Sequence, residues 1–223
     1  MSPGTHVTPA RVAAAQEVRV LVHAAVGSDV DDAALDEVRA LVGQANALLA
    51  RAPRRVRTLG DFTAFAEHTE EPVLHAMADR AVAGPANPAA VDLGTRLEGD
   101  VALADVTFGP AFEGAPGRVH GGWVAAVFDD LLGSAMAQHR TPGFTGRLTV
   151  HYRAPVPVDR PVRFRAWPGV RQGRKLLVHA DARIEDLVLA SADALFVLVD
   201  REHFATHAHD LLHDVLDRTA GSG

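Results

Sequence analysis

The sequence predicts an α+β protein, in which a helical N-terminal segment precedes one domain built from a helix and an antiparallel sheet. Three observations predict this class. Apolar residues recur at helical spacing in the first quarter of the chain, a long helix with one apolar face is predicted at 121–138, and alternating segments follow it up to residue 199. With 223 residues and 48% hydrophobic content, the chain can form a substantial core.

The first quarter of the chain is expected to form an antiparallel helix pair. Apolar residues recur at helical spacing over 18–26, Gly27-Ser28-Asp29 interrupts them, and the period resumes over 35–49. A short helix is predicted over 71–83, and 84–88, with two prolines and a glycine, is typical of a linker. The predicted organisation is a helical extension and linker at 1–90, a domain at 91–200 and a tail at 201–223.

Beyond the linker the hydrophobic period changes from helical to alternating. One or two strands are predicted over 97–108, and a loop rich in Gly and Pro leads from 109 to the helix. Turn residues divide the rest into four further predicted strands, near 145–154, 161–171, 174–185 and 187–199. A helix followed by antiparallel strands is typical of a sheet with the helix on one face.

His120-Gly121-Gly122 stands at the predicted start of the long helix. Glycines leave the backbone uncrowded by Cβ atoms, so a ligand can approach the peptide N–H groups. At a helix start these N–H groups lack intrahelical partners and carry partial positive charge, so they can stabilise an oxygen that gains negative charge. The alternative interpretation is that the two glycines only permit a tight turn.

Two aspartates follow on the same helix. Its apolar face is predicted to consist of Val124, Val127, Phe128, Leu131, Leu132 and Ala135. Asp129 and Asp130 flank this face on opposite sides, and Asp129 shares its side with small residues that let a substrate come close. We therefore favour Asp129 as a functional acid. The alternative is that both are ordinary solvated residues of an amphipathic helix.

A resemblance to a known family follows from several motifs in order. The sequence has Gly114 to Gly122, which ends in His-Gly-Gly, then Asp129, Gly133, Thr145, the run 148–157, Gly173-Arg174-Lys175 and Ala190-Ser191-Ala192. Over residues 91–200 this pattern resembles the PaaI-type (HGG motif) hotdog-fold acyl-CoA thioesterases. The resemblance implies a hotdog fold, an antiparallel sheet wrapped around a central helix, with an N-terminal helical extension.

The resemblance also implies a reaction and a site. An acyl-CoA would be hydrolysed to a free acid and CoA between two subunits of a homo-oligomer, with the Gly121 amide as oxyanion donor and Gly122 beside the substrate. Asp129 would act as general base or as nucleophile, two routes that the sequence does not separate. Thr145 would orient the attacking water or Asp129. His120 would position the turn or contact the substrate, or would be a structural histidine.

The alternation of the strand near 145–154 sorts its side chains into two faces. Leu148, Val150 and Tyr152 are expected to cover the helix, and Thr145, Arg147, Thr149, His151 and Arg153 to point the other way. The resemblance places His151, Arg153, Arg174 and Lys175 near the phosphates and nucleotide of coenzyme A, a task that suits basic groups. The alternative is an ordinary solvent-facing sheet.

Composition restricts the partners and the location. Lys and Arg total 22 against 28 Asp and Glu, so the net charge of −6 argues against binding to nucleic acid or to an anionic membrane. The chain has no cysteine and no 18-residue apolar run, and we expect a cytoplasmic protein without a cofactor.

Two alternatives to hydrolysis remain open, a hotdog enoyl-CoA hydratase and a non-catalytic acyl-CoA-binding or interaction protein. A rival site lies in the tail, where imidazoles at helical spacing suggest a Zn or Ni site. No acid or cysteine completes that ligand set, so we predict no metal. The histidines concerned are His203, His207, His209 and His213.

Overall fold

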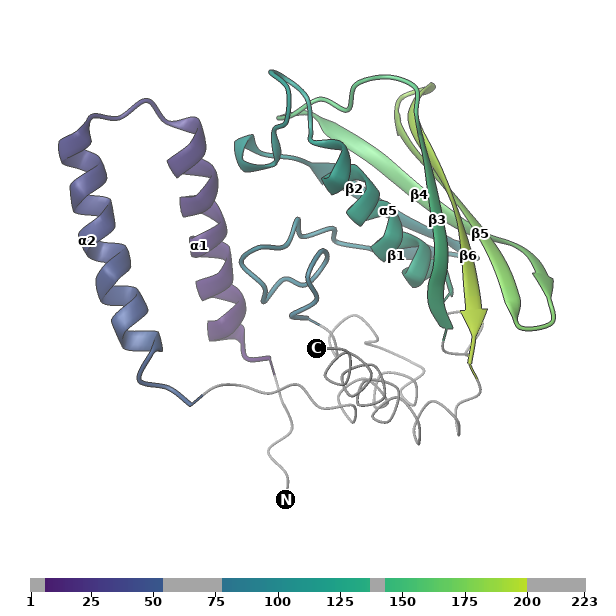
Figure 1. Ribbon diagram of the computed structural model, residues 1–223, viewed down its shortest axis with the longest axis horizontal. Coiled ribbons are helices and arrows are strands. Elements are labelled where there is room, and N and C mark those ends of the chain that lie inside the picture. Colours follow the sequence, from purple (N-terminus) through teal and green to yellow (C-terminus); the bar gives the residue numbers. More distant parts are fainter. Residues whose placement is uncertain (1–6, 54–77, 137–142, 200–223) are drawn as a thin grey trace, which may run out of the picture.

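The computed structural model describes residues 7–53, 78–136 and 143–199, and it consists of a helical pair beside a sheet that holds one helix (Figure 1). The helical pair is formed by α1 (Pro9–Gly27) and α2 (Asp32–Leu49). The sheet comprises β1 (Arg96–Glu98), β2 (Val101–Thr107), β3 (Gly143–Tyr152), β4 (Pro161–Gln172), β5 (Lys175–Ile184) and β6 (Leu187–Leu198). A 3-10 turn, η1 (Pro110–Phe112), and the central helix α5 (Gly121–Met136) lie between β2 and β3.

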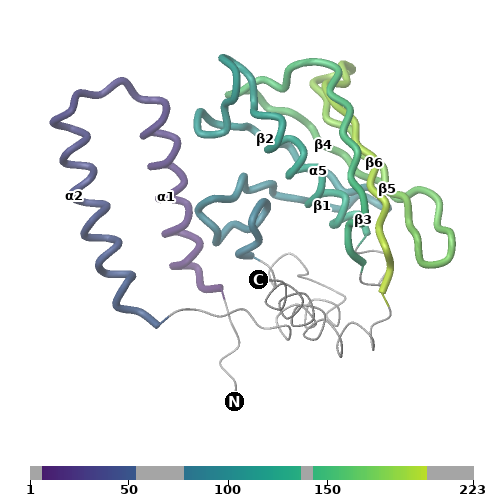
Figure 2. The backbone as a smooth tube through the Cα atoms, viewed as in Figure 1, coloured from purple at the N-terminus to yellow at the C-terminus, as the bar shows by residue number. Residues whose placement is uncertain are grey.

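The six described strands form one antiparallel sheet in the order β1-β2-β4-β5-β6-β3. Helix α5 packs across one face of the sheet. Its main contacts are with β2, β3, β4, β5 and β6. Figure 2 shows the sheet curving around α5. This arrangement confirms the α+β class and the hotdog architecture, and it leaves β3 at one edge.

The predicted apolar face of α5 forms the centre of the core. All six residues named for it are at most 1% exposed. Strands β5 and β6, which pack against the helix, carry small side chains at many positions that face it. These small side chains let the helix and the sheet approach closely. The small inward residues are Ala180, Ala182, Ala190, Ala192 and Ala194.

The N-terminal helices have ordinary helix starts. The Thr8 hydroxyl accepts from the Arg11 amide at 3.2 Å before α1, and the Asp31 carboxylate accepts from the Ala34 amide at 2.9 Å before α2. Helix α1 lies against the sheet domain, whereas α2 lies beyond α1 and has no buried residue (Figure 1). Much of the predicted apolar stripe therefore stays accessible, with Val22 45% exposed and Leu49 71% exposed.

The segment before the sheet differs from the sequence prediction. Residues 71–77 of the predicted short helix lie outside the described residues, and 78–83 form turns instead of a helix. The expected linker at 84–88 is also a series of turns, in which Ala86 is buried, as are Ala83 and Ala90 on either side of it. The predicted tail at 201–223, with its four histidines, lies outside the described residues.

Candidate active site

Helix α5 begins at Gly121, and the residue before it caps the first turn. The Nδ1 atom of His120 accepts a hydrogen bond from the Gly122 amide at 3.1 Å, and the His120 carbonyl accepts from the Trp123 amide at 2.9 Å. Within the described ranges, no protein acceptor contacts the Gly121 amide. The turn thus engages the Gly122 amide and leaves the Gly121 amide without an acceptor among the described residues, as is common in the first turn of a helix.

Tyr152, the last residue of β3, reaches this same turn. Its hydroxyl donates a hydrogen bond of 2.7 Å to the Gly121 carbonyl. A Cβ atom at position 121 would lie 3.3 Å from the tyrosine ring, so the glycine permits the close approach. The alternation correctly placed Tyr152 on the helix side, but we assigned it no role. The sequence feature that indicates it is a tyrosine at the end of the predicted strand, on the face expected to cover the helix.

Thr145 and Asp129 meet at the other end of β3. The threonine hydroxyl donates to Asp129 Oδ1 at 2.9 Å, and both side chains are exposed. The prediction that Thr145 faces away from the helix is wrong. A bulge between Thr145 and Arg147 shifts the register, so Thr145 pairs with inward-facing Phe196 and Arg147 with Leu195. One extra residue in a strand moves a side chain to the opposite face.

Asp130 has a different environment from its neighbour. Its side chain is 11% exposed and lies 3.1 Å from the guanidinium of Arg80, which is 16% exposed. Burial raises the pKa of Asp130, with the nearby Asp129 charge in the same direction, and Arg80 opposes the shift. Asp130 is thus part of an internal ion pair, and Asp129 is the acid that solvent or a substrate can reach.

Within one chain, Gly121 and Asp129 are too far apart to contact the same atom of a bound molecule. Asp129 lies eight positions after Gly121 on α5, which is about 12 Å along the axis at 1.5 Å per residue. The Gly121 turn adjoins Tyr152 at one end of β3, and Asp129 adjoins Thr145 near the other end. The two halves of the predicted site therefore lie at opposite ends of one edge strand.

The four predicted CoA contacts are divided in the same way. His151 and Arg153 lie at the Tyr152 end of β3, whereas Arg174 directly precedes β5 and Lys175 is its first residue, near the start of β3. The Arg174 Nε donates to the Leu198 carbonyl at 3.1 Å. All four residues are exposed. They form two separate basic pairs in one chain.

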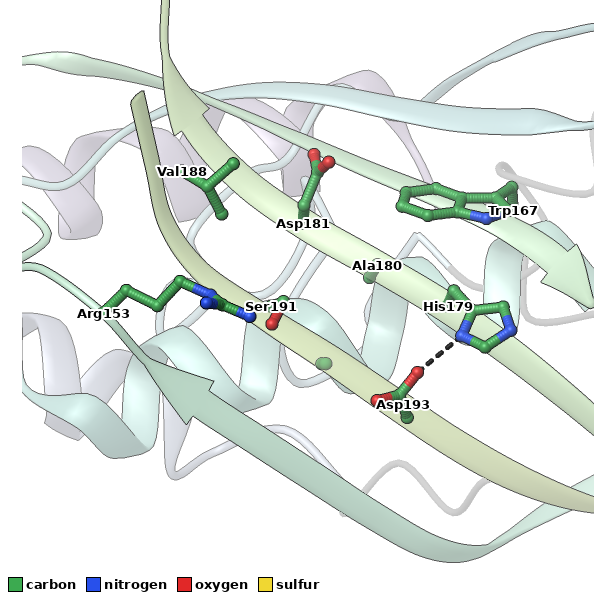
Figure 3. A pocket seen from close by; sticks show the side chains of 9 residues that line it. Arg153, Trp167, His179, Ala180, Asp181, Val188, Ser191 and Asp193 are labelled. Atoms are coloured by element: carbon green, nitrogen blue, oxygen red, sulfur yellow. Dashed lines mark hydrogen bonds and ion pairs between the residues drawn. The ribbon is translucent and has the colours of Figure 1, made fainter. Parts of the chain in front are cut away.

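Arg153 also lines a pocket of about 360 Å³ on the outer face of the sheet, away from α5 (Figure 3). Trp167 and His179 lie along this face, and His179 Nδ1 lies 2.5 Å from Asp193 Oδ1.

In the described ranges, no three His, Asp or Glu side chains come together as a group that could hold a metal ion. None of the described helices is long and apolar enough to span a membrane.

An antiparallel sheet wrapped around one central helix places the chain in the class of hotdog-fold proteins. Residues 116–191 match the model of the thioesterase superfamily. The matched region is about a third of the chain, and over that region the chain is similar to this family.

Similar proteins carry related names. Acyl-coenzyme A thioesterase THEM4 of Bos taurus is 32% identical over 102 residues, which cover 44% of this chain and 41% of the relative. THEM4 of Xenopus laevis is 32% identical over 91 residues, covering 40% and 41%. The chain thus matches about two fifths of the length of these curated relatives.

A solved structure gives a longer match. The crystal structure of the thioesterase superfamily protein RHA08564 aligns with a TM-score of 0.69 at 27% identity. The alignment covers 88% of this chain and 97% of that one, so the similarity extends beyond the sheet domain into the N-terminal segment.

Proposed function

We propose that the protein hydrolyses an acyl-CoA thioester to a free acid and CoA. The observation that carries this proposal is the hydrogen bond of 2.9 Å from Thr145 to an exposed Asp129, on a helix that opens with an unengaged Gly121 amide. An acid held by a hydroxyl and a preorganised backbone donor are the two groups that acyl transfer to water requires. The names of the THEM4 relatives support the same substrate class.

The proposed site forms between two subunits. Strand β3 is an edge of the described sheet, and a twofold partner can add its own β3 in antiparallel orientation. Antiparallel pairing would place the Tyr152 end of one β3 beside the Thr145 end of the other. Gly121 of one subunit would then face Asp129 from the second subunit, which removes the separation of about 12 Å within one helix.

The same pairing explains the division of the basic residues. His151 and Arg153 from one subunit would approach Arg174 and Lys175 from the other, so each site would receive both pairs. Guanidinium and ammonium groups bind phosphate through charge-assisted hydrogen bonds. Because the chain carries a net charge of −6, a local basic cluster is needed to bind the anionic CoA moiety.

In the proposed reaction, the Gly121 amide donates to the thioester carbonyl oxygen as it becomes an oxyanion. Asp129 either removes a proton from water, which attacks the carbonyl carbon, or attacks that carbon itself and forms an acyl-aspartate anhydride that water then cleaves. In both routes the carbon–sulfur bond breaks and CoA leaves as the thiolate. Thr145 orients Asp129, and His120 positions the turn through the Gly122 amide beside the substrate.

Release of free thiol from a panel of acyl-CoAs tests the reaction. A thioesterase liberates CoA, an enoyl-CoA hydratase changes the acyl chain without liberating CoA, and a binding protein does neither. Hydration or simple binding across the whole panel would contradict the proposal.

The oxyanion donor can be tested by removing one N–H group. Gly121→Pro deletes the amide hydrogen at the first helical position, where proline is well tolerated. Gly121→Ala is the matched control, because it keeps the N–H and adds a Cβ only 3.3 Å from the flexible Tyr152 ring. We expect a loss of about 100- to 1,000-fold in kcat for proline, and a much smaller loss for alanine. Equal activities would refute the donor role.

Mixing two inactive variants tests the shared site. If Gly121→Pro and Asp129→Asn subunits are unfolded and refolded together, half of the dimers are mixed, and each mixed dimer has one site with both groups intact. Activity should return to about a quarter of the wild-type value. No recovery, with mixed dimers demonstrated by mass spectrometry, would show that both groups act from one chain.

A further inference from the structure

Helix α1 docks on the sheet domain through polar groups. The Arg19 guanidinium donates to the carbonyls of Pro85 and Asn87, each at 3.1 Å, and forms an ion pair of 3.3 Å with Asp92. One turn further along, His23 reaches the η1 turn. Ala15 on the same side is buried. The helix therefore has a defined position against the domain, set by specific hydrogen bonds.

His23 binds η1 in two ways. Its Nδ1 atom accepts a hydrogen bond of 3.2 Å from the Ala111 amide, and its ring meets the Phe112 ring edge-on with 5.0 Å between centroids. The contact is also close sterically. A Cβ atom at Gly109 would lie 2.6 Å from His23 Nδ1, so the absence of a side chain at 109 is required for this docking.

Phe112 connects η1 to the start of α5. Its carbonyl accepts the His120 amide at 2.9 Å, and its ring lies edge-on against Trp123 with 4.7 Å between centroids. Gly121 lies between these two contacts in the chain. The orientation of its amide is therefore set from both sides by a residue that His23 holds in place.

We infer that His23 is a positioning residue for the Gly121 oxyanion donor, and that helix α1 tunes the catalytic turn through the contacts His23–Ala111, Phe112–His120 and Phe112–Trp123. This inference rests on the proposed function. Oxyanion stabilisation depends on donor placement to within about 0.5 Å, so release of η1 should lower kcat more than it changes KM.

The hydrogen bond requires an unprotonated Nδ1, because a protonated imidazole has no acceptor to offer to the Ala111 amide. Burial, followed by the Arg19 guanidinium on α1, lowers the pKa of His23, and the Asp159 carboxylate opposes the shift. The η1 turn itself contributes no charged side chain. The bond is thus maintained at neutral pH and is lost as pH falls through the lowered pKa of His23.

Two nearly isosteric substitutions test the acceptor. The Oδ1 atom of His23→Asn falls near the position of Nδ1 and can accept from Ala111, whereas the longer side chain of His23→Gln places its oxygen near the position of Nε2. We expect Asn to keep kcat within about threefold and Gln to lose about tenfold or more, with KM nearly constant in both. Equal kcat values for the two variants, whether retained or lost, would overturn the inference.

The pH profile adds a second activity test. An acid decrease in kcat that survives in His23→Asn belongs to other groups. We expect the wild type to show an additional decrease that His23→Asn lacks, because the amide carbonyl does not titrate in this range. Identical profiles for the wild type and His23→Asn would contradict the proposal.

Trp123 fluorescence provides a measurement that does not depend on activity. The chain has two tryptophans, so a Trp167→Phe background isolates Trp123. Its emission should change with pH around a midpoint below the ordinary histidine value, and His23→Asn should abolish this change. If the wild type hydrolyses no acyl-CoA, the proposed function fails while this titration still tests the coupling. A change that persists in His23→Asn would refute the coupling itself.

Discussion

The adjacent acids Asp129 and Asp130 should give opposite results when each is replaced by asparagine. Asp130→Asn leaves the Arg80 guanidinium, 16% exposed, without its charge partner. Removal of one member of a buried ion pair costs about 3–5 kcal/mol. At about 2–4 °C per kcal/mol for a chain of this size, Tm should fall by about 6–20 °C. Activity per folded molecule should change little.

Asp129→Asn should have the reverse effect. Among the described residues, the exposed Asp129 carboxylate accepts one hydrogen bond, from Thr145, so its replacement should cost about 1 kcal/mol or less. Loss of a general base or nucleophile should lower kcat by about 100- to 10,000-fold. Calorimetry and thiol-release kinetics on the same preparations measure both quantities. A stable but inactive Asp130→Asn protein, or a fully active Asp129→Asn protein, would refute the assignment.

A double variant separates the ion pair from general damage to the fold. Asp130 Oδ1 and Arg80 Nε are both buried, and each lacks a hydrogen bond of good geometry in the described residues. The raised pKa of Asp130, due first to burial, indicates that Arg80 does not fully compensate the buried charge. The double variant Asp130→Leu with Arg80→Met should therefore be less destabilised than the single variant Asp130→Leu. A larger loss for the double variant would contradict this account.

Three further outcomes can be measured. Tyr152→Phe removes the 2.7 Å hydrogen bond to the Gly121 carbonyl and should lower kcat about tenfold with little change in Tm; unchanged kcat would exclude a role for the hydroxyl. Thr145→Ser should keep most activity and Thr145→Val should lose about tenfold, because only serine retains the donor to Asp129; equal rates would contradict this. Burial raises the pKa of Asp181, but hydrogen bonds from Arg165 and Arg183 outweigh burial and lower it overall, so the carboxylate stabilises the fold above its unfolded pKa of about 4. Asp181→Asn should thus lower Tm at neutral pH, and the difference should shrink as pH falls below about 4; a difference independent of pH would refute the linkage.

The sequence predicted those parts of the fold that depend on local periodicity. The apolar face of α5 is buried as expected, and each of the last four strands begins and ends within two residues of its prediction. Such patterns are readable because a helix buries every third or fourth residue and a strand every second one. The predicted helix pair was found for the same reason.

Features that depend on distant residues could not be predicted in this way. The partner of Asp130 is Arg80, fifty positions earlier, in a segment where the sequence suggested a helix. The bulge after Thr145 reverses the face of that side chain, although strict alternation gave the opposite answer. Helix α1 docks through Arg19 and His23, whereas periodicity drew attention to its apolar residues. In each case the determining contact joins segments that no local pattern relates.

The bulge in β3 has a functional reason in the proposed site. A regular strand would direct both Thr145 and Arg147 to the outer face, and Asp129 would then lack its hydroxyl partner. The extra residue turns Thr145 inward to Asp129 and still leaves Arg147 and His151 on the outer face. Edge strands are common places for such bulges, because an irregular ladder costs less where one side has no neighbour in the chain. The same edge position makes β3 available to a second subunit, so one strand can both orient the acid and bring the partner's oxyanion donor to it.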